Sequence, residues 1–130
     1  MIKKYRRKYI GYNVTLRPTK GRRYVVQFPY EIYNAELGMY FKIPGGFKTN
    51  GANVPRIFWS LIEPNQSDIM PAVIAHDYLC EMAVLHVNTF KQADKFLLHN
   101  LVYLGCNKIK AKTIYYSCRL YHILRYGYNA

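Results

Sequence analysis

The chain has 130 residues, of which 51% are hydrophobic and 20% charged, and its formal net charge is +12. This length and composition fit a single globular domain over residues 1–130 and exclude a disordered or fibrous chain. No apolar run is long enough to cross a bilayer, so we expect no transmembrane segment. The basic N-terminus is not followed by the apolar region of a secretory signal, so we expect no signal peptide.

Positive charge is concentrated toward both ends of the chain. Residues 1–30 contain nine Lys and Arg and no acidic residue, and no Asp or Glu follows residue 94. Such a surface attracts the phosphates of nucleic acid or of anionic phospholipid. A solvated basic face that only sets solubility accounts for the charge equally well.

The cysteines Cys80, Cys106 and Cys118 form no C-x-x-C pair and no even-numbered framework. This usage suits a reducing compartment, and the spacing predicts no zinc site. Cys80 and Cys118 fall at apolar helical positions and are predicted to pack in the core. Three histidines show no partner at metal-binding spacing and are treated as ordinary: His86, His99 and His122.

The first half of the chain predicts β-strands, because its apolar residues recur with a period of two. Pro29 interrupts this pattern and suggests an edge strand or a bulge. A basic strand region is predicted over 1–23, and a hairpin-and-loop region over 24–60. Within the second region we expect a strand over 24–32, a hairpin connection over 34–38, a returning strand over 39–43 and a glycine loop over 47–56.

The second half, residues 67–126, predicts helices. Ser67 is a candidate N-cap for a helix that ends near Val84, and Thr89 with Gln92 has the form of a capping box for the next helix. That second helix is expected to end at Gly105, and a third to span about 109–126. We therefore predict an α+β fold: a small antiparallel β-sheet or hairpin half packed on two to three helices.

One constellation within the helices could support chemistry. His76 and Asp77 lie inside the first predicted helix, and Asp94 lies early in the second. Because about four residues connect these helices, they should pack antiparallel and bring His76 and Asp94 to similar heights. A carboxylate beside an imidazole fixes its tautomer and stabilises its cation, so His76 could deprotonate water. A buried polar network that fixes helix packing is the alternative.

Asp77 points about 100° round the helix from His76 and so toward a different target. A hard cation held by this carboxylate and by loop carbonyls near Gly51 is the natural candidate.

Three ordered motifs give the sequence a resemblance to a known family. They are FKTNGANVPRIFW at residues 47–59, HDYL at 76–79 and AD at 93–94. This order resembles a family of small uncharacterised bacteriophage and prophage proteins, whose pattern is G-F-x-T-D-G-A-S-x-P-R-x-F-W, then H-D-x-L-Y, then A-D. The resemblance covers about residues 24–105 and implies no particular activity.

The same order is more distantly similar to the phospholipases A2, in which a D-G-C-S-x-P loop precedes H-D-x-x-Y. This similarity implies a phospholipase A2-like antiparallel helix pair with His76 as general base and Asp94 as its orienting partner. It also implies calcium at Asp77, with main-chain carbonyls from Asn50 and Gly51. The calcium ion would polarise the ester carbonyl.

The sequence departs from these patterns at several positions. Asn50 stands where both patterns have Asp, which removes a negative charge and should lower calcium affinity. Asn53 stands at the serine position, and Cys80 stands at the tyrosine that closes the phage motif. Ile74 and Ala75 occupy the positions of paired cysteines in the secreted enzymes.

Three functional hypotheses follow. The chain is a calcium-assisted ester or lipid hydrolase or a catalytically degenerate relative of one; or it is a virion structural or accessory protein that binds other virion proteins through a basic, tyrosine-rich surface; or it is a nucleic-acid-binding module. The resemblance implies a location in the virion or the host cytoplasm. Against the third hypothesis, no helix-turn-helix, zinc or RNA-binding signature is present.

Overall fold

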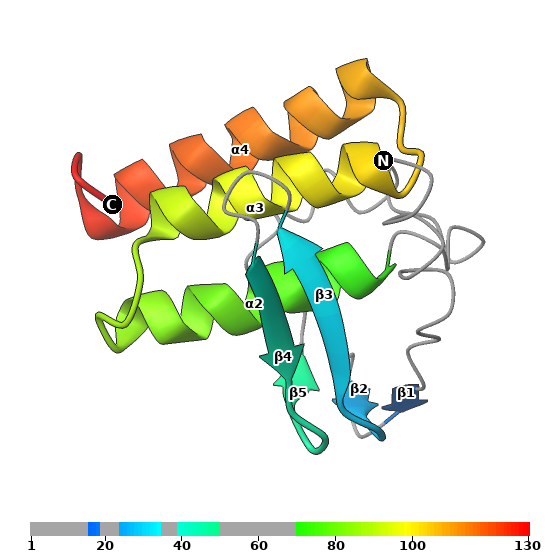
Figure 1. The fold of residues 1–130 in the computed structure, drawn as a ribbon. Coiled ribbons are helices and arrows are strands. Elements are labelled where there is room, and N and C mark those ends of the chain that lie inside the picture. Colours follow the sequence, from blue (N-terminus) through cyan, green and yellow to red (C-terminus); the bar gives the residue numbers. More distant parts are fainter. Residues whose placement is uncertain (1–15, 19–23, 35–38, 50–69) are drawn as a thin grey trace.

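The computed structural model describes residues 16–18, 24–34, 39–49 and 70–130, and it has the predicted α+β arrangement, with two small antiparallel sheets beside three helices (Figure 1). One sheet holds three strands in the order β1-β2-β5, and the other holds β3 and β4. The elements are β1 (Leu16–Pro18), β2 (Tyr24–Val26), β3 (Tyr30–Asn34), β4 (Met39–Ile43), β5 (Lys48–Thr49), α2 (Met70–Val84), α3 (Phe90–Tyr103) and α4 (Lys108–Tyr126).

The strand predicted over residues 24–32 is two strands, which belong to different sheets. The chain leaves β2 after Val26 and enters β3 at Tyr30, and Pro29 lies between them. Proline cannot donate a backbone hydrogen bond, so the ladder is interrupted there. The pattern located the interruption at Pro29 and predicted an edge strand or a bulge there, but its single strand over 24–32 is wrong, because the structure has two strands.

The predicted glycine loop begins with a short strand. Pro44, Gly45 and Gly46 break β4 as expected, and Gly46 has a φ of 87°, which favours glycine. The turn brings the backbone back to β2, because Val26 N donates to Phe47 O at 2.9 Å and Gly46 N donates to Val26 O at 2.7 Å. Residues 48 and 49 therefore pair with β2 as β5, although they were predicted as loop.

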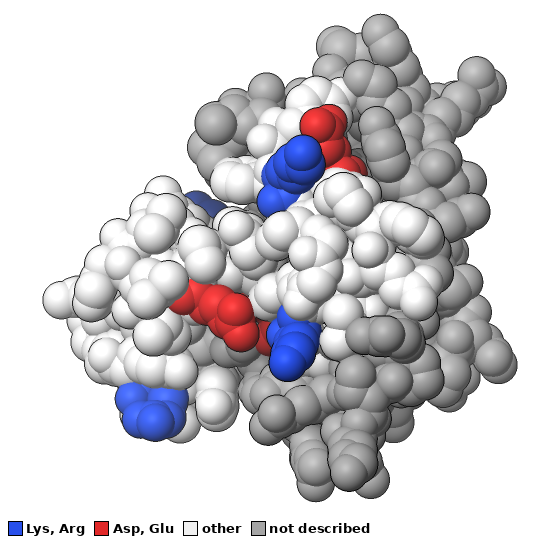
Figure 2. All heavy atoms as spheres, turned by 90° about the horizontal axis from the view of Figure 1, so that it is seen from below, with Lys and Arg blue, Asp and Glu red and all other residues white. Residues whose placement is uncertain are grey.

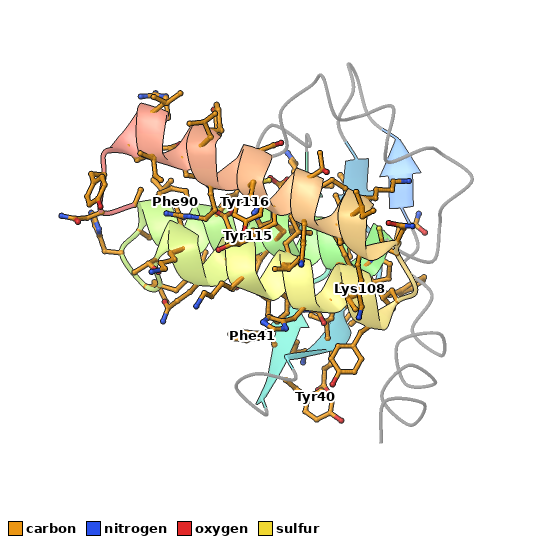
Figure 3. The ribbon with its side chains drawn as sticks, turned by 90° about the horizontal axis from the view of Figure 1, so that it is seen from above. Tyr40, Phe41, Phe90, Lys108, Tyr115 and Tyr116 are labelled. Carbon is orange, nitrogen blue, oxygen red and sulfur yellow. The ribbon has the colours of Figure 1, made fainter. Side chains whose placement is uncertain are left out.

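The hairpin of β3 and β4 is confirmed, with Asn34 opposite Met39 and Tyr30 opposite Ile43. Its residues alternate: Ile32 and Ile43 are fully buried, whereas Tyr40 is exposed. Phe41 of β4 is labelled in Figure 3. Its ring meets Phe96 of α3 edge to face at 5.1 Å between centroids. This contact packs the hairpin onto the helices.

The helix ends follow their local sequence signals closely. Thr89 caps α3: its side chain accepts from Gln92 N, and the Gln92 side chain accepts from Thr89 N, as in the predicted capping box. Asn107 caps α4 by accepting from the backbone N–H groups of Ile109 and Lys110. Gly127, with a φ of 107°, follows the last turn of α4. Ser67, the predicted cap of the first helix, lies outside the described residues.

The three helices run alternately up and down, and α3 lies between α2 and α4 (Figure 1). Short connections enforce this order, since only residues 85–89 join α2 to α3 and 104–107 join α3 to α4. The central helix buries a set of apolar residues, among them Phe96, Leu97 and Leu101. The polar side chains where the three helices meet, among them His76, Asp94 and His122, are buried too, so they must satisfy one another.

Candidate active site

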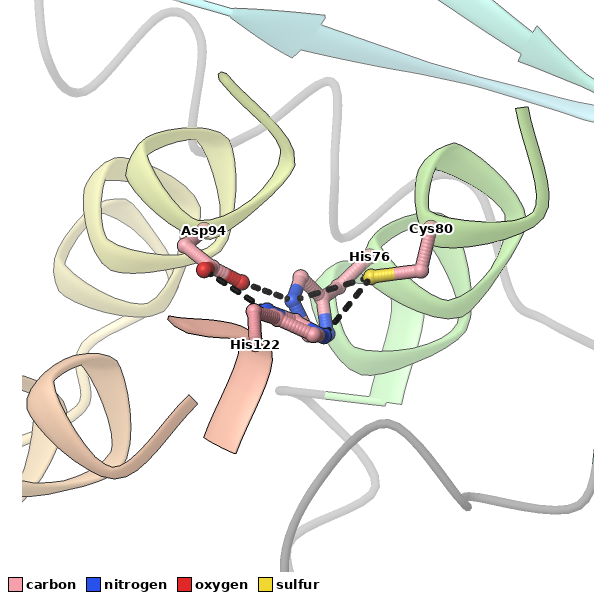
Figure 4. Close-up of side chains that lie close together, drawn as sticks. All are labelled: His76, Cys80, Asp94 and His122. Carbon is pink, nitrogen blue, oxygen red and sulfur yellow. Dashed lines mark hydrogen bonds and ion pairs between the residues drawn. The ribbon is translucent and has the colours of Figure 1, made fainter. Parts of the chain in front are cut away.

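Four side chains that can bind protons or metals converge where the three helices meet (Figure 4). His76 and Cys80 project from one face of α2, since they are four residues apart, and Asp94 comes from the second turn of α3. His122 comes from the last part of α4. All four side chains are buried.

Asp94 is the centre of this group. One carboxylate oxygen, Oδ1, lies 2.7 Å from His76 Nε2, and the other, Oδ2, lies 2.8 Å from His122 Nδ1. Arg119 Nη1 donates to the same Oδ2 at 2.9 Å, and Arg119 is only 12% exposed. Three nitrogen donors thus surround a carboxylate that has no contact with solvent.

These donors decide the charge of Asp94. Burial alone would raise the pKa of this carboxyl, but the hydrogen bonds from His122 and His76 and the electrostatic attraction of these two side chains hold the pKa below its ordinary value. Asp94 is therefore a carboxylate and accepts from both imidazoles. It follows that His76 carries a proton on Nε2 and His122 carries one on Nδ1.

The second nitrogen of each imidazole has a different environment. His122 Nε2 faces the Cys80 sulfur at 3.8 Å, so it can accept the thiol proton. His76 Nδ1 is buried and has no hydrogen-bond partner among the described parts of the chain. A buried polar atom without a partner costs free energy and calls for an explanation.

Cys80 Sγ lies between the two histidines, 3.4 Å from His76 Nε2 and 3.8 Å from His122 Nε2. Burial raises the pKa of this thiol, and the negative charges of Asp94 and Asp77 raise it further. Without a bound cation, Cys80 is therefore a neutral thiol rather than a reactive thiolate.

Asp77 points away from this cluster, toward the three-stranded sheet. Its Oδ2 accepts a hydrogen bond from the hydroxyl of Thr49 in β5. Glu81 is one turn along the helix, where partial burial and then the charge of Asp77 raise its pKa. Among the described residues, Asp77 belongs to no group of three or more side chains that could hold a metal ion. Asn50 and Gly51, the other predicted calcium ligands, lie outside the described residues.

The structure thus brings His76 and Asp94 together and directs Asp77 elsewhere, as the helix geometry predicted. It also adds three residues that the sequence analysis left out of the site: Cys80, Arg119 and His122. Cys80 is buried as predicted but contacts both histidines, and His122 is not the ordinary histidine that its spacing suggested. Two spacings in the sequence could have indicated these residues, because side chains three or four residues apart lie on one face of a helix. They are i, i+4 for His76 and Cys80, and i, i+3 for Arg119 and His122.

The described part of the surface shows mixed charge. On the face drawn in Figure 2, the described basic and acidic side chains are scattered rather than gathered into one patch. Eight of the nine basic residues within 1–30 lie outside the described residues, and the side chain of the ninth, Arg17, is not described either. None of the described helices is long and apolar enough to span a membrane.

Comparison with known proteins identifies the class. Residues 24–118, which include β2 to β5, α2, α3 and the first part of α4, match the family described as Protein of unknown function (DUF1353), and the chain belongs to this family. The match ends before His122.

A particular relative is an uncharacterized protein, y4jT, of Sinorhizobium fredii (strain NBRC 101917 / NGR234). It is 28% identical over 85 residues, which are 65% of this chain and 24% of the relative. The chain thus spans about a quarter of the length of this curated relative. No solved structure matches the chain.

Proposed function

We propose that the chain is a hydrolase in which His76 is the general base and Asp94 orients it, acting on a lipid or another ester. One observation carries this proposal: Asp94 Oδ1 holds His76 Nε2 at 2.7 Å, while His76 Nδ1 is buried and has no partner among the described residues. A general base needs a lone pair free to accept a proton, and Nδ1 supplies one.

The hydrogen bonds assign the direction of proton transfer. Because Nε2–H donates to Asp94, the lone pair of the neutral imidazole is on Nδ1, where it can take a proton from water attacking an ester carbonyl. The imidazolium that forms remains paired with the Asp94 carboxylate, which lowers its free energy. Arg119 and His122 keep this carboxylate ionised and fixed, so they act as positioning residues.

Calcium is part of the same proposal. Asp77 and main-chain carbonyls of Asn50 and Gly51 would hold the ion, with Thr49 orienting the Asp77 carboxylate. When bound, calcium supplies positive charge for the ester carbonyl oxygen and for the oxyanion that follows. Asn50 in place of an acid predicts weak affinity, so activity is expected only at high calcium concentrations.

The motif resemblance supports a bacteriophage or prophage origin and, with it, a place in the virion or the host cytoplasm. A virion accessory protein that keeps this geometry without turnover, and a nucleic-acid-binding module, are the competing functions. Both would use the basic residues near the N-terminus, which lie outside the described residues. Turnover of an ester would distinguish the hydrolase from both of these functions, since neither of them involves catalysis.

The test is fatty-acid release from mixed phospholipid vesicles, with and without millimolar calcium. Wild-type protein is expected to turn over only with calcium, since Asp77 then has its cation. His76→Ala is expected to lower the rate about 10²–10⁴-fold, because it removes the base. Asp77→Asn weakens the calcium site and is expected to abolish turnover at the same calcium concentration.

His99→Ala is the matched control, since it removes a half-buried histidine of α3 that does not reach the cluster. It should leave the rate unchanged. Turnover that persists in folded His76→Ala, or its absence from folded wild-type protein in calcium, would refute the proposal and leave the dyad as a packing network.

A further inference from the structure

We infer that His76, Cys80, Asp94 and His122 form a buried site for a transition-metal ion of the zinc class. Each residue offers one donor atom, and the four atoms lie within 4.8 Å of one another. They come from three different helices (Figure 4). All four side chains are buried. This site is separate from the proposed calcium site, which is built on Asp77.

The donor types select the metal. Two imidazoles, one thiol and one carboxylate suit Zn²⁺ or Co²⁺, whereas Ca²⁺ requires six to eight oxygen ligands. Four protein ligands without an open position are typical of a structural zinc site, and complete burial agrees with that type.

Two distances between donors are close to those of tetrahedral coordination, and a third must change. With zinc–nitrogen and zinc–sulfur bonds of about 2.0–2.3 Å, neighbouring donors should lie about 3.3–3.6 Å apart. Cys80 Sγ lies 3.4 Å from His76 Nε2 and 3.8 Å from His122 Nε2. The 2.7 Å distance from His76 Nε2 to Asp94 Oδ1 is that of a hydrogen bond, and it must lengthen by about half an ångström when metal replaces the shared proton.

His122 is already turned toward the group. Its Nδ1–H donates to Asp94 Oδ2, and its Nε2 lone pair faces Cys80 and the centre of the group. Because a carboxylate bound to the ion through Oδ1 cannot also reach the far nitrogen of a histidine on the same ion, this hydrogen bond must break when the metal binds. Arg119 bonds the same Oδ2, so Asp94 Oδ1 remains the ligand atom.

Metal binding has a defined proton balance. The ion binds the Cys80 thiolate, and the thiol proton is released to solvent. It also binds His76 Nε2, so the remaining imidazole proton moves to Nδ1. Nδ1 then has no lone pair for water, and a metal-loaded site and the proposed dyad exclude each other. This exclusion rests on the proposed function, but the metal site itself does not.

The experiment is a titration of chelator-treated full-length protein with Co²⁺, followed by displacement with Zn²⁺. We expect one equivalent of Co²⁺, absorption bands of tetrahedral cobalt, a near-ultraviolet thiolate-to-cobalt band, and loss of all bands when Zn²⁺ is added. Cys80→Ser should remove the thiolate band, and His122→Asn should weaken binding about tenfold or more. Cys106→Ser and His99→Asn, which change residues outside the group, should match wild type.

The wild-type titration decides the inference even if a variant does not fold. Absence of a thiolate band at saturating Co²⁺ would overturn it, as would binding that Cys80→Ser leaves intact. Neither result depends on hydrolysis. Hydrolysis is therefore measured in calcium on protein freed of transition metals. A protein that binds Co²⁺ but, when freed of it, hydrolyses no ester would refute the proposed function alone, and one that hydrolyses esters but takes up no Co²⁺ would refute this inference alone.

Discussion

At the scale of single residues, the carboxylate of Asp94 joins side chains from the other two helices. It is fully buried, and its two oxygens accept from His76, His122 and Arg119, which belong to two other parts of the chain. Removing one member of a buried charged network leaves the others unpaired, which costs far more than the network contributes relative to an apolar core. This one carboxylate therefore links all three helices, in addition to their apolar contacts.

Asp94→Ala is expected to lower the free energy of unfolding by about 3–5 kcal/mol, because two imidazoles and a guanidinium lose their common acceptor. Chemical denaturation in the presence of a chelator measures this loss without a contribution from bound metal. Glu81→Gln, a change at an exposed carboxyl of α2, is the control and should stay within about 0.5 kcal/mol of wild type. A loss below about 1 kcal/mol in Asp94→Ala would show that the network does not support the fold.

The pairing of His76 with Asp94 was predictable, because a short connection and a fixed rise per residue set the relative heights of two consecutive helices. The contribution of His122 was not. It comes from near the C-terminal end of α4, and its contact with Asp94 depends on how α4 is rotated and shifted against α3. Side-chain packing, such as the stacking of Phe90 on Tyr126 at 4.3 Å, determines that rotation.

At the scale of elements, the residues that determine a helix end lie close to it in the sequence, whereas those that determine a strand end can lie far away. The capping box at Thr89 and the glycine after Tyr126 lie within a few residues of the ends that they mark, so the sequence located both. The division of residues 24–32 into β2 and β3 was missed, because it depends on β5 pairing with β2 from more than 20 residues away. Strand pairing partners are not encoded by the local pattern.

Thr89→Ala is expected to destabilise the protein by about 1 kcal/mol, because Gln92 N loses its acceptor and the capping box is broken. Thermal or denaturant unfolding measures the change. Thr113→Ala is the matched control: its hydroxyl bonds Ile109 O within α4 and caps no helix end, so the change should be small or slightly stabilising. Equal losses in the two variants would argue against a specific capping contribution.

At the scale of the whole molecule, a few contacts join the sheets to the helices and thereby position the candidate sites. Thr49 of β5 bonds Asp77, and Phe47 meets Tyr78 edge to face at 5.3 Å. Tyr30 of β3 donates its hydroxyl to Pro71 O, at the start of α2, at 2.8 Å. The cluster at Asp94 is built by helices alone, whereas the proposed calcium site needs both halves. Loosening the sheets should therefore affect calcium-dependent turnover before cobalt binding.

Tyr30 offers the last prediction, which concerns alkaline stability. Burial raises the pKa of Tyr30 well above its ordinary value of 10.0, so the folded protein keeps this phenol neutral where the unfolded chain ionises it. The contribution of Tyr30 is complete below that ordinary pKa and is lost as the pH rises above it, since only the unfolded state releases the proton. Tyr30→Phe should cost about 1 kcal/mol at neutral pH through the lost hydrogen bond to Pro71. Above about pH 10, the free energy of unfolding of Tyr30→Phe should fall less steeply than that of wild type, by up to about 1.4 kcal/mol per pH unit.

Tyr128→Phe is the control, since it changes a side chain that is 88% exposed and should keep the wild-type slope. Parallel slopes for Tyr30→Phe and wild type would mean that Tyr30 ionises in the folded protein and that the contact between β3 and α2 opens before the domain unfolds.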